Sequence, residues 1–199
     1  MARVVLSSGN KHKISEIKSI LRDFDLEVIS KNDIGYKDFE VEEDGDTLEE
    51  NSMKKAMELW KKTGDIVIAD DTGLFVEYLD GEPGVYSARY AGEDATYDDN
   101  NKLLLQKLEN VPADKRKAYF KTVVSIIDSE GASFSVEGIC KGEIGFEPVG
   151  DNGFGYDPIF IVEGLDKTFA QLTDIEKNKY SHRGKAVRNL KNIIGEILK

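Results

Sequence analysis

The sequence is poor in the side chains that build thiol or imidazole metal sites. Its 199 residues include a single cysteine, Cys140, and two histidines. One thiol can form neither an intrachain disulfide nor a thiolate zinc site. Such sparse use of cysteine is typical of a reducing compartment, and we therefore predict a cytoplasmic protein.

Long apolar runs are also missing. No segment approaches the roughly 18 apolar residues of a membrane-spanning helix, and the run at residues 1–8 is too short for a signal-peptide core. Hydrophobic residues still make up 40% of the chain, which is enough to bury a core. We expect one domain over residues 1–199, built as two closely packed lobes, with no membrane partner.

Positive charge is scarce as well. The 27 Lys and Arg residues are outnumbered by 38 Asp and Glu residues, and the formal net charge is −11. An acidic chain repels phosphodiester backbones, so we expect no nucleic-acid partner. A small nucleotide that carries Mg²⁺ is not excluded, because the metal cancels much of its charge. The acidic surface can equally serve only to keep the protein soluble.

The pattern of apolar residues predicts an α/β fold. Residues 4–6 are a strand candidate, and an amphipathic helix and a second strand at 26–29 follow. We predict further strands at residues 66–69, 118–128, 133–140 and 159–162, and further helices at about 47–63, 96–108 and 183–198. Together these elements predict a mixed sheet flanked by helices, with an antiparallel ribbon formed by the two long strands.

The loop at Ser8–Lys13 connects the first predicted strand to the first predicted helix. A helix N-terminus attracts anions, because its unsatisfied N–H groups and its dipole point at them. Gly9 permits a close approach to the backbone, and Lys13 adds a positive charge. The segment lacks the spacing of a P-loop. It indicates either a phosphate site or an ordinary capped loop with a surface lysine.

Two adjacent carboxylates, Asp70 and Asp71, follow the apolar residues 66–69. We predict that the strand ends here in a turn, Asp70–Gly73, where α/β proteins place ligands. A cation would relieve the repulsion between the carboxylates, and hard oxygen ligands suit Mg²⁺. Neighbouring strand residues point to opposite faces, so one aspartate should face a ligand while the other supports the turn. The alternative is a turn in which Asp only caps the backbone.

An acidic run over residues 37–46 precedes the second predicted helix. Thr47 and Glu50 have the spacing of a capping box at the start of that helix. A run of like charges usually forms a solvated surface. Glu43 becomes a candidate second metal ligand only if the fold brings it beside Asp71.

Two segments in the last quarter of the chain carry candidate binding residues. Phe154 stands between glycines, where an aromatic ring is either part of a packed turn or a platform for stacking a flat ligand. Lys177 and the Ser-His-Arg segment 181–183 offer donors that could read a keto oxygen on a base or bind phosphate. The alternative for these donors is a capped helix start with solvated charges.

These motifs occur together and in a fixed order. The chain contains Ser-Gly-Asn-x-x-Lys, Ala-Asp-Asp-Thr-Gly-Leu, Pro-Gly-Val-Tyr-Ser-Ala-Arg-Tyr-Ala-Gly, Gly-Phe-Gly-Tyr-Asp-Pro and Ser-His-Arg-Gly-Lys-Ala. In this combination the sequence resembles the inosine/xanthosine triphosphate pyrophosphatase family from Val4 to the last helix. Thr72 replaces a serine found in many members and keeps the hydroxyl group.

The resemblance implies a two-lobed mixed α/β fold with a central active-site cleft, usually in a homodimer. It implies Mg²⁺-dependent hydrolysis of ITP, dITP and XTP at the α–β phosphoanhydride, which removes these nucleotides from the pool as monophosphates. Asp71 would be the catalytic residue and would bind the metal together with Glu43. The implied substrate contacts are Ser8, Gly9, Asn10, Lys11, His12, Lys13, Thr72, Phe154, Gly155, Tyr156, Asp157, Lys177, His182 and Arg183, with Lys55 as a further candidate phosphate contact.

Three other functions compete with this one. A pyrophosphatase of related fold for modified pyrimidine or standard nucleotides, as in the Maf-like proteins, is disfavoured by the Ser-His-Arg and Gly-Phe-Gly-Tyr-Asp motifs. A nucleotide sensor without turnover is disfavoured by Asp71 and Glu43, because a sensor needs no hydrolytic metal centre. Nucleic-acid binding is disfavoured by the net charge. The sequence does not rank inosine against xanthosine nucleotides, or ribose against deoxyribose.

Overall fold

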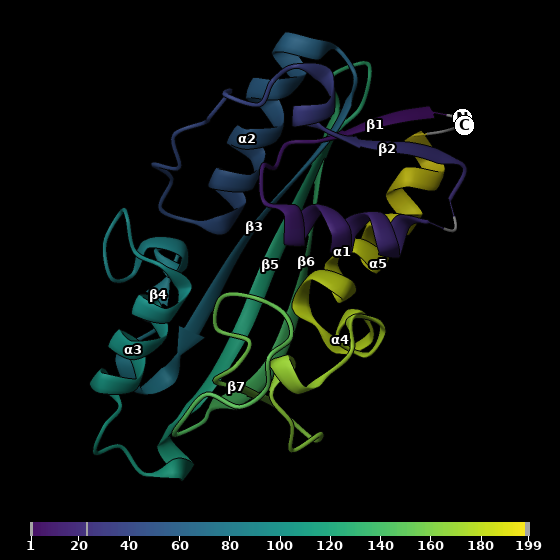
Figure 1. The fold of residues 1–199 in the computed structure, drawn as a ribbon. Helices are drawn as coiled ribbons and strands as arrows, with labels where there is room; N and C mark the ends of the chain where they lie inside the picture. The colour runs from purple at the N-terminus through teal and green to yellow at the C-terminus, as the bar shows by residue number, and fades with distance from the viewer. Residues whose placement is uncertain (1, 23, 198–199) are drawn as a thin grey trace. The chain divides into compact units, whose positions relative to one another are not determined.

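The computed structural model describes residues 2–22 and 24–197 (Figure 1). These residues form two compact units. Unit 1 comprises Met1–Asp71, Thr122–Gly138 and Arg183–Lys199, and unit 2 comprises Thr72–Lys121 and Ile139–His182. The strands follow the hydrogen-bonded order β2-β1-β3-β5-β6-β7, and β4 pairs with β3. The sheet contains both parallel and antiparallel pairs, so the predicted mixed α/β class is confirmed.

The N-terminal part of unit 1 is a parallel α/β arrangement. Strand β1 (Ala2–Leu6) leads through α1 (Lys11–Leu21) to β2 (Leu26–Ser30), and α2 (Leu48–Thr63) then leads to β3 (Ile66–Val76). β1 pairs in parallel with β2 on one side and with β3 on the other. The loop after β1 therefore lies where the strand order reverses, the position at which open α/β sheets bind ligands.

Alternate residues of β3 pack against different helices. Ile66 and Ile68 belong to a core cluster with α1 and α5 (His182–Ile197), whereas Val67 and Ala69 belong to a cluster with α2. α1 and α5 lie side by side in Figure 1. Because side chains alternate along a strand, the next two residues of β3 continue onto the same two faces.

The predicted turn at Asp70–Gly73 is wrong. β3 continues through both aspartates to Val76 without a break. A strand can hold these two carboxylates because each is matched by cationic side chains, as described below. Gly73 marks a close approach between backbones and not a turn: a Cβ atom there would lie 2.6 Å from the carbonyl oxygen of Gly84 in β4 (Pro83–Gly84).

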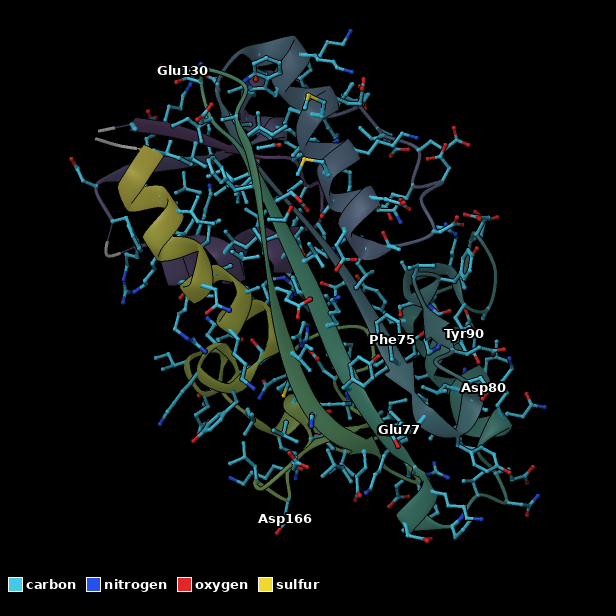
Figure 2. The ribbon with its side chains drawn as sticks, turned by 180° about the vertical axis from the view of Figure 1, so that it is seen from behind. Phe75, Glu77, Asp80, Tyr90, Glu130 and Asp166 are labelled. Atoms are coloured by element: carbon cyan, nitrogen blue, oxygen red, sulfur yellow. The ribbon has the colours of Figure 1, made fainter. Side chains whose placement is uncertain are left out.

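Unit 2 has its own core. β4 pairs antiparallel with the end of β3, and β7 (Phe160–Val162) pairs antiparallel with β6 (Ser133–Ile144). The rings of Phe120, Phe160 and Phe169 pack together within the unit's apolar cluster. Phe75, which Figure 2 labels on β3, stacks on Tyr119 of β5 (Lys117–Ile127), with 5.0 Å between the ring centroids.

Most predicted elements agree with the structure within a few residues. The last helix, predicted at 183–198, is observed as His182–Ile197, and position 198 lies outside the described residues. A tight turn at Glu130 joins β5 and β6, the two long strands that were predicted to form a ribbon (Figure 2). Helix α3 spans Tyr97–Lys107. Short helices not predicted from the sequence are η1 (Lys31–Ile34), η2 (Glu77–Leu79), η3 (Ser87–Arg89), η4 (Ala113–Lys115), η5 (Phe169–Gln171) and α4 (Asp174–Tyr180).

Within the part of the chain that the structure describes, none of the helices combines the length and the apolar character needed to cross a membrane.

Candidate active site

The loop after β1 has a defined shape that is set by its own polar residues. Asn10 is the N-cap of α1, and its Oδ1 accepts hydrogen bonds from the backbone N–H groups of His12 at 3.0 Å and Lys13 at 3.2 Å. The Oγ of Ser8 accepts a third hydrogen bond, from the backbone N–H of Asn10, at 3.2 Å. The side chains of Lys11 and His12 are exposed. The loop is therefore preorganised at the start of a helix, as an anion site requires.

Ser7 fastens this loop to β3 and α2. Its backbone N–H donates to the carbonyl oxygen of Ile68 at 2.8 Å, and its Oγ donates to the carbonyl oxygen of Lys55 at 2.9 Å. One hydrogen bond thus links the start of the loop to Lys55. The ammonium group of Lys55 binds two carboxylates, which are described below.

Asp70 lies in a buried ion-pair network. Its Oδ2 is 3.2 Å from Nζ of Lys13 and accepts hydrogen bonds of 3.2 Å from Nε and Nη2 of Arg183. Arg183 donates a further hydrogen bond from Nη1 to Glu16 on α1. Burial by itself would raise the pKa of Asp70, but the positive charges of Lys13, Arg183 and Lys55 hold that pKa far below its usual range. Asp70 is therefore a charged anchor for α1 and α5.

Asp71 lies on the other face of β3, beside α2. Nζ of Lys55 donates to Oδ1 of Asp71 at 2.8 Å and to Oε1 of Glu43 at 2.8 Å. Burial raises the pKa of Asp71 despite the opposing effects of Lys55 and Lys13. The pKa of Lys55 is raised, because the charges of Asp71 and Glu43 outweigh the effect of burial. The fold therefore brings the acidic run beside Asp71 and joins the two carboxylates through one ammonium group.

This arrangement fits a bound divalent cation. The two carboxylates converge on one cationic point, and with the charge of Lys55 included the three side chains carry a net charge of −1. Glu43 keeps 31% of its side chain exposed, so one of the two carboxylates borders solvent. Among the described residues no group of three or more His, Cys, Asp or Glu side chains could hold a metal. Mg²⁺ commonly binds one or two carboxylates and takes its other ligands from water and phosphate.

In unit 2 a second set of predicted residues surrounds Asp157. Lys177 donates from Nζ to Oδ2 of Asp157 at 2.6 Å, and the backbone N–H of Phe154 donates to the same oxygen at 2.7 Å. The ammonium of Lys177 lies 4.6 Å from the centroid of the Phe154 ring. Gly153 has φ +78°, and a Cβ atom there would lie 2.1 Å from Oδ2 of Asp157. Glycine is therefore strongly favoured at this position, and the turn holds the backbone of Phe154 against Asp157.

His182 and Tyr156 are buried in the same unit, where one is held by ring stacking and the other by a hydrogen bond. The ring of His182 stacks on Phe120, with centroids 4.5 Å apart and an interplanar angle of 18°. The hydroxyl group of Tyr156 donates to the carbonyl oxygen of Ser87 at 2.9 Å. The hydroxyl of Tyr156 thus supports the fold of the unit, and the ring of His182 is held in place by stacking on Phe120.

The structure divides the residues predicted from the sequence between the two units. Unit 1 holds the loop Ser8–Lys13, Asp71, Glu43, Lys55 and Arg183, and unit 2 holds Thr72, the segment 154–157, Lys177 and His182.

Sequence reasoning missed Glu16. Its position three residues after Lys13 places both on one face of α1 and is the only signal that could have found it, since a charge on an amphipathic helix normally faces solvent. The partners of Arg183 were also unforeseen, because Asp70 and Arg183 are 113 residues apart in sequence.

Comparison with known proteins shows the family of the chain. A model of the Ham1 family matches residues 4–193. A dITP/XTP pyrophosphatase of Thermoanaerobacter sp. (strain X514) is 53% identical over 192 residues, which cover 96% of each chain. A solved Ham1 protein of Staphylococcus aureus is 42% identical, with a TM-score of 0.86 over 98% of each chain. One from Coxiella burnetii is 38% identical, with a TM-score of 0.88 over 98% of this chain and 100% of that one. The resemblance drawn from the motifs is confirmed: the chain belongs to the Ham1 family.

Proposed function

We propose that this protein is a nucleoside triphosphate pyrophosphatase that hydrolyses ITP, dITP and XTP. Cleavage at the α–β phosphoanhydride gives the nucleoside monophosphate and pyrophosphate. The observation that carries the proposal is the convergence of Asp71 and Glu43 on one buried cationic point. The names of relatives such as the Thermoanaerobacter dITP/XTP pyrophosphatase support the substrate class.

We propose that Asp71 and Glu43 hold a divalent cation, Mg²⁺. When bound, it offsets charge on the phosphate oxygens and lowers the pKa of a water molecule. Oδ1 of Asp71 binds Lys55, and Asp71 accepts the proton of the attacking water at Oδ2. Burial, which raises the pKa of Asp71, makes this carboxylate a stronger base, and a base is most effective when its pKa lies near the working pH.

The phosphate groups are assigned to residues of unit 1. Ser8–Lys13 provides a helix N-terminus and the charge of Lys13, and Lys55 provides a second cation. Phosphoryl transfer requires mainly positioning and charge stabilisation from a protein. Because Lys13 also pairs with Asp70, its ammonium is held in place before a substrate binds.

The base is assigned to unit 2, to the ring of Phe154 and the donors Lys177 and His182. Stacking of a base on an aromatic ring contributes about 1–3 kcal/mol. Hypoxanthine and xanthine carry an acceptor at position 6, where adenine carries a donor, so ATP would leave a protein donor without a partner at a cost of about 1–3 kcal/mol. Arg183, also predicted to contact the base, has its guanidinium bound to Asp70 and Glu16. Guanine shares the 6-keto group, so GTP must be rejected at position 2.

Three further expectations from the sequence remain proposals. These are a homodimer, a cytoplasmic location, and a single pyrophosphatase domain over residues 1–199.

A pyrophosphate-release assay tests the proposed function. The purified protein is incubated with Mg²⁺ and, separately, with ITP, XTP, dITP, GTP and ATP. We expect release of pyrophosphate and monophosphate from the first three, at a kcat/KM well above that for ATP and GTP. Release of orthophosphate would contradict cleavage at the α–β bond. Tight ITP binding without turnover would favour a nucleotide sensor.

A further inference from the structure

Lys31, at the start of η1, has a buried ammonium group that donates hydrogen bonds to main-chain oxygens. Its residue is 8% exposed. Nζ donates to the carbonyl oxygens of Tyr36 at 3.4 Å, Lys37 at 3.3 Å and, in a shorter contact, Phe39. An ammonium group has three N–H donors, so these three acceptors saturate it and leave no donor to bind a phosphate directly.

Residues 36–39 supply the carbonyl oxygens that form a cage around the ammonium of Lys31. This segment is also anchored by its aromatic side chains. The rings of Tyr36 and Phe39 pack edge to face, with centroids 6.0 Å apart, and both contact the core cluster that contains residues of α2. The hydroxyl group of Tyr36 donates to the carbonyl oxygen of Lys62, in the last turn of α2, at 3.3 Å. The rings fix where the segment lies, and the cage around Lys31 fixes its backbone path.

The cage depends on the cation. Three carbonyl oxygens that point at one buried position repel each other unless a positive charge lies between them, because each carries partial negative charge and is removed from water. Removing the ammonium would therefore make this backbone path unfavourable. The chain continues directly from the cage into residues 40–46, which carry Glu43, so a change in this path would move Glu43 away from Lys55 and Asp71.

The side chain of Lys31 also passes near the loop after β1. A Cβ atom added to Gly9 would lie 3.9 Å from Cε of Lys31, so a larger residue at position 9 would meet this side chain. One side chain thus lies near the loop assigned to the phosphates and holds the segment that leads to Glu43.

We propose that Lys31 is a positioning residue, whose ammonium group orders residues 36–39 and thereby holds Glu43 at the metal-binding position. The role assigned to Glu43 rests on the proposed function, whereas the ordering of residues 36–39 does not. Lys31 is not a catalytic residue, because its three donors are used by the main chain.

The test compares Lys31→Met with Lys37→Met. The first keeps the apolar stem and removes the caged ammonium, and the second removes an exposed lysine side chain from the same segment. Mn²⁺ binding is titrated without nucleotide, and hydrogen exchange of the amides in 36–46 is followed in parallel. For Lys31→Met we expect Mn²⁺ affinity to fall about 10- to 100-fold, the range found when a group supporting a metal ligand is removed. Exchange in 36–46 should also accelerate. Lys37→Met should match the wild type in both measurements.

A double-mutant cycle separates positioning of Glu43 from general destabilisation. In a Glu43→Gln background, we expect Lys31→Met to change the residual Mn²⁺ affinity by less than about threefold, because the ligand it positions is already lost. An effect of the same size in both backgrounds would overturn the proposal. So would wild-type Mn²⁺ binding and exchange in Lys31→Met, or in Lys31→Gln if the methionine variant does not fold. Failure of the wild type to release pyrophosphate would instead refute the proposed function, and the exchange measurement would still decide the role of Lys31.

Discussion

Asp70 and Asp71 are neighbours in the sequence, but they lie among different side chains. Asp70 meets Lys13 and Arg183, which hold its pKa low and keep it charged. Asp71 shares one lysine with Glu43, and its pKa is raised by burial. A carboxylate matched by two cations is suited to holding helices together. One that shares a single cation with another carboxylate is suited to binding a metal and accepting a proton.

Asp71→Asn is expected to abolish most turnover while the fold survives. The amide keeps the shape of the side chain but loses the negative charge and the ability to accept a proton. Loss of a positioned base typically lowers rates by about 100- to 10 000-fold, and we expect kcat for ITP to fall by at least the lower figure. Steady-state kinetics and circular dichroism check the two parts of this prediction.

Asp65→Asn is the matched control, since Asp65 directly precedes β3 and binds the exposed Arg3. It should keep wild-type kcat. Near-normal turnover in Asp71→Asn would remove Asp71 from the mechanism.

At the scale of elements, β3 connects the two aspartates to the backbone of β4. The strand pairs with β1 at its start and with β4 at its end. Gly73 makes the second pairing possible, because its missing side chain lets the Gly84 carbonyl approach. The same strand that presents Asp71 therefore depends on a glycine two residues later.

Gly73→Ala is expected to destabilise the protein. The added methyl group would lie 2.6 Å from the carbonyl oxygen of Gly84, so β4 must shift or the strands must separate. Forcing extra atoms into a packed region typically costs about 1–3 kcal/mol. Urea unfolding should show a lower midpoint, and the free energy of unfolding derived from it should fall by about 1–3 kcal/mol.

Gly195→Ala is a control that we expect to raise the free energy of unfolding. Gly195 lies in α5, and a Cβ atom there meets no atom within 4 Å. Alanine in a helix interior is about 0.5–1 kcal/mol more favourable than glycine, so this variant should be more stable than the wild type. Equal unfolding midpoints for both variants would show that the approach of Gly84 does not constrain position 73.

At the scale of the whole molecule, the predicted binding residues fall into two groups with different chemistry. The group in unit 1 consists of carboxylates, lysines and a helix N-terminus, and it suits a metal and phosphates. The group in unit 2 consists of stacked rings with a lysine and a histidine, and it suits a flat base. The division predicts that variants in the two groups affect catalysis in different ways.

Lys13→Met and His182→Asn should separate these effects. Lys13 would contact a part common to all nucleotides, so we expect kcat/KM to fall by the same factor, about 10- to 100-fold, for ITP and ATP. His182→Asn should change the ITP/ATP ratio of kcat/KM about 5- to 100-fold, because it removes a donor matched only to the 6-keto group. Kinetics on both nucleotides measure the two ratios. A His182→Asn variant with an unchanged ratio would contradict the assignment of the base to this group.

Local patterns in the sequence predicted most of the elements and the chemical types of the site. The capping box at Thr47 and Glu50 forms as expected, because a cap needs only neighbouring residues. The N-cap role of Asn10 and the hydrogen-bonded turn at Phe154 are likewise local. The family resemblance rested on such segments.

Only the tertiary structure decided which charges meet. The pair of Asp70 with Arg183 joins residues far apart in the sequence. The contacts of Lys55 with Glu43 and of Lys31 with its carbonyl oxygens depend on the path of an irregular segment. The Asp-Asp segment was predicted as a turn that ends the strand after the apolar residues 66–69. Within the fold, cations from α1, α2 and α5 offset the charges of the two aspartates, so the strand continues. The sequence by itself determined that carboxylates, lysines and a helix N-terminus are present, and the packing of distant elements decided the partner and the charge environment of each.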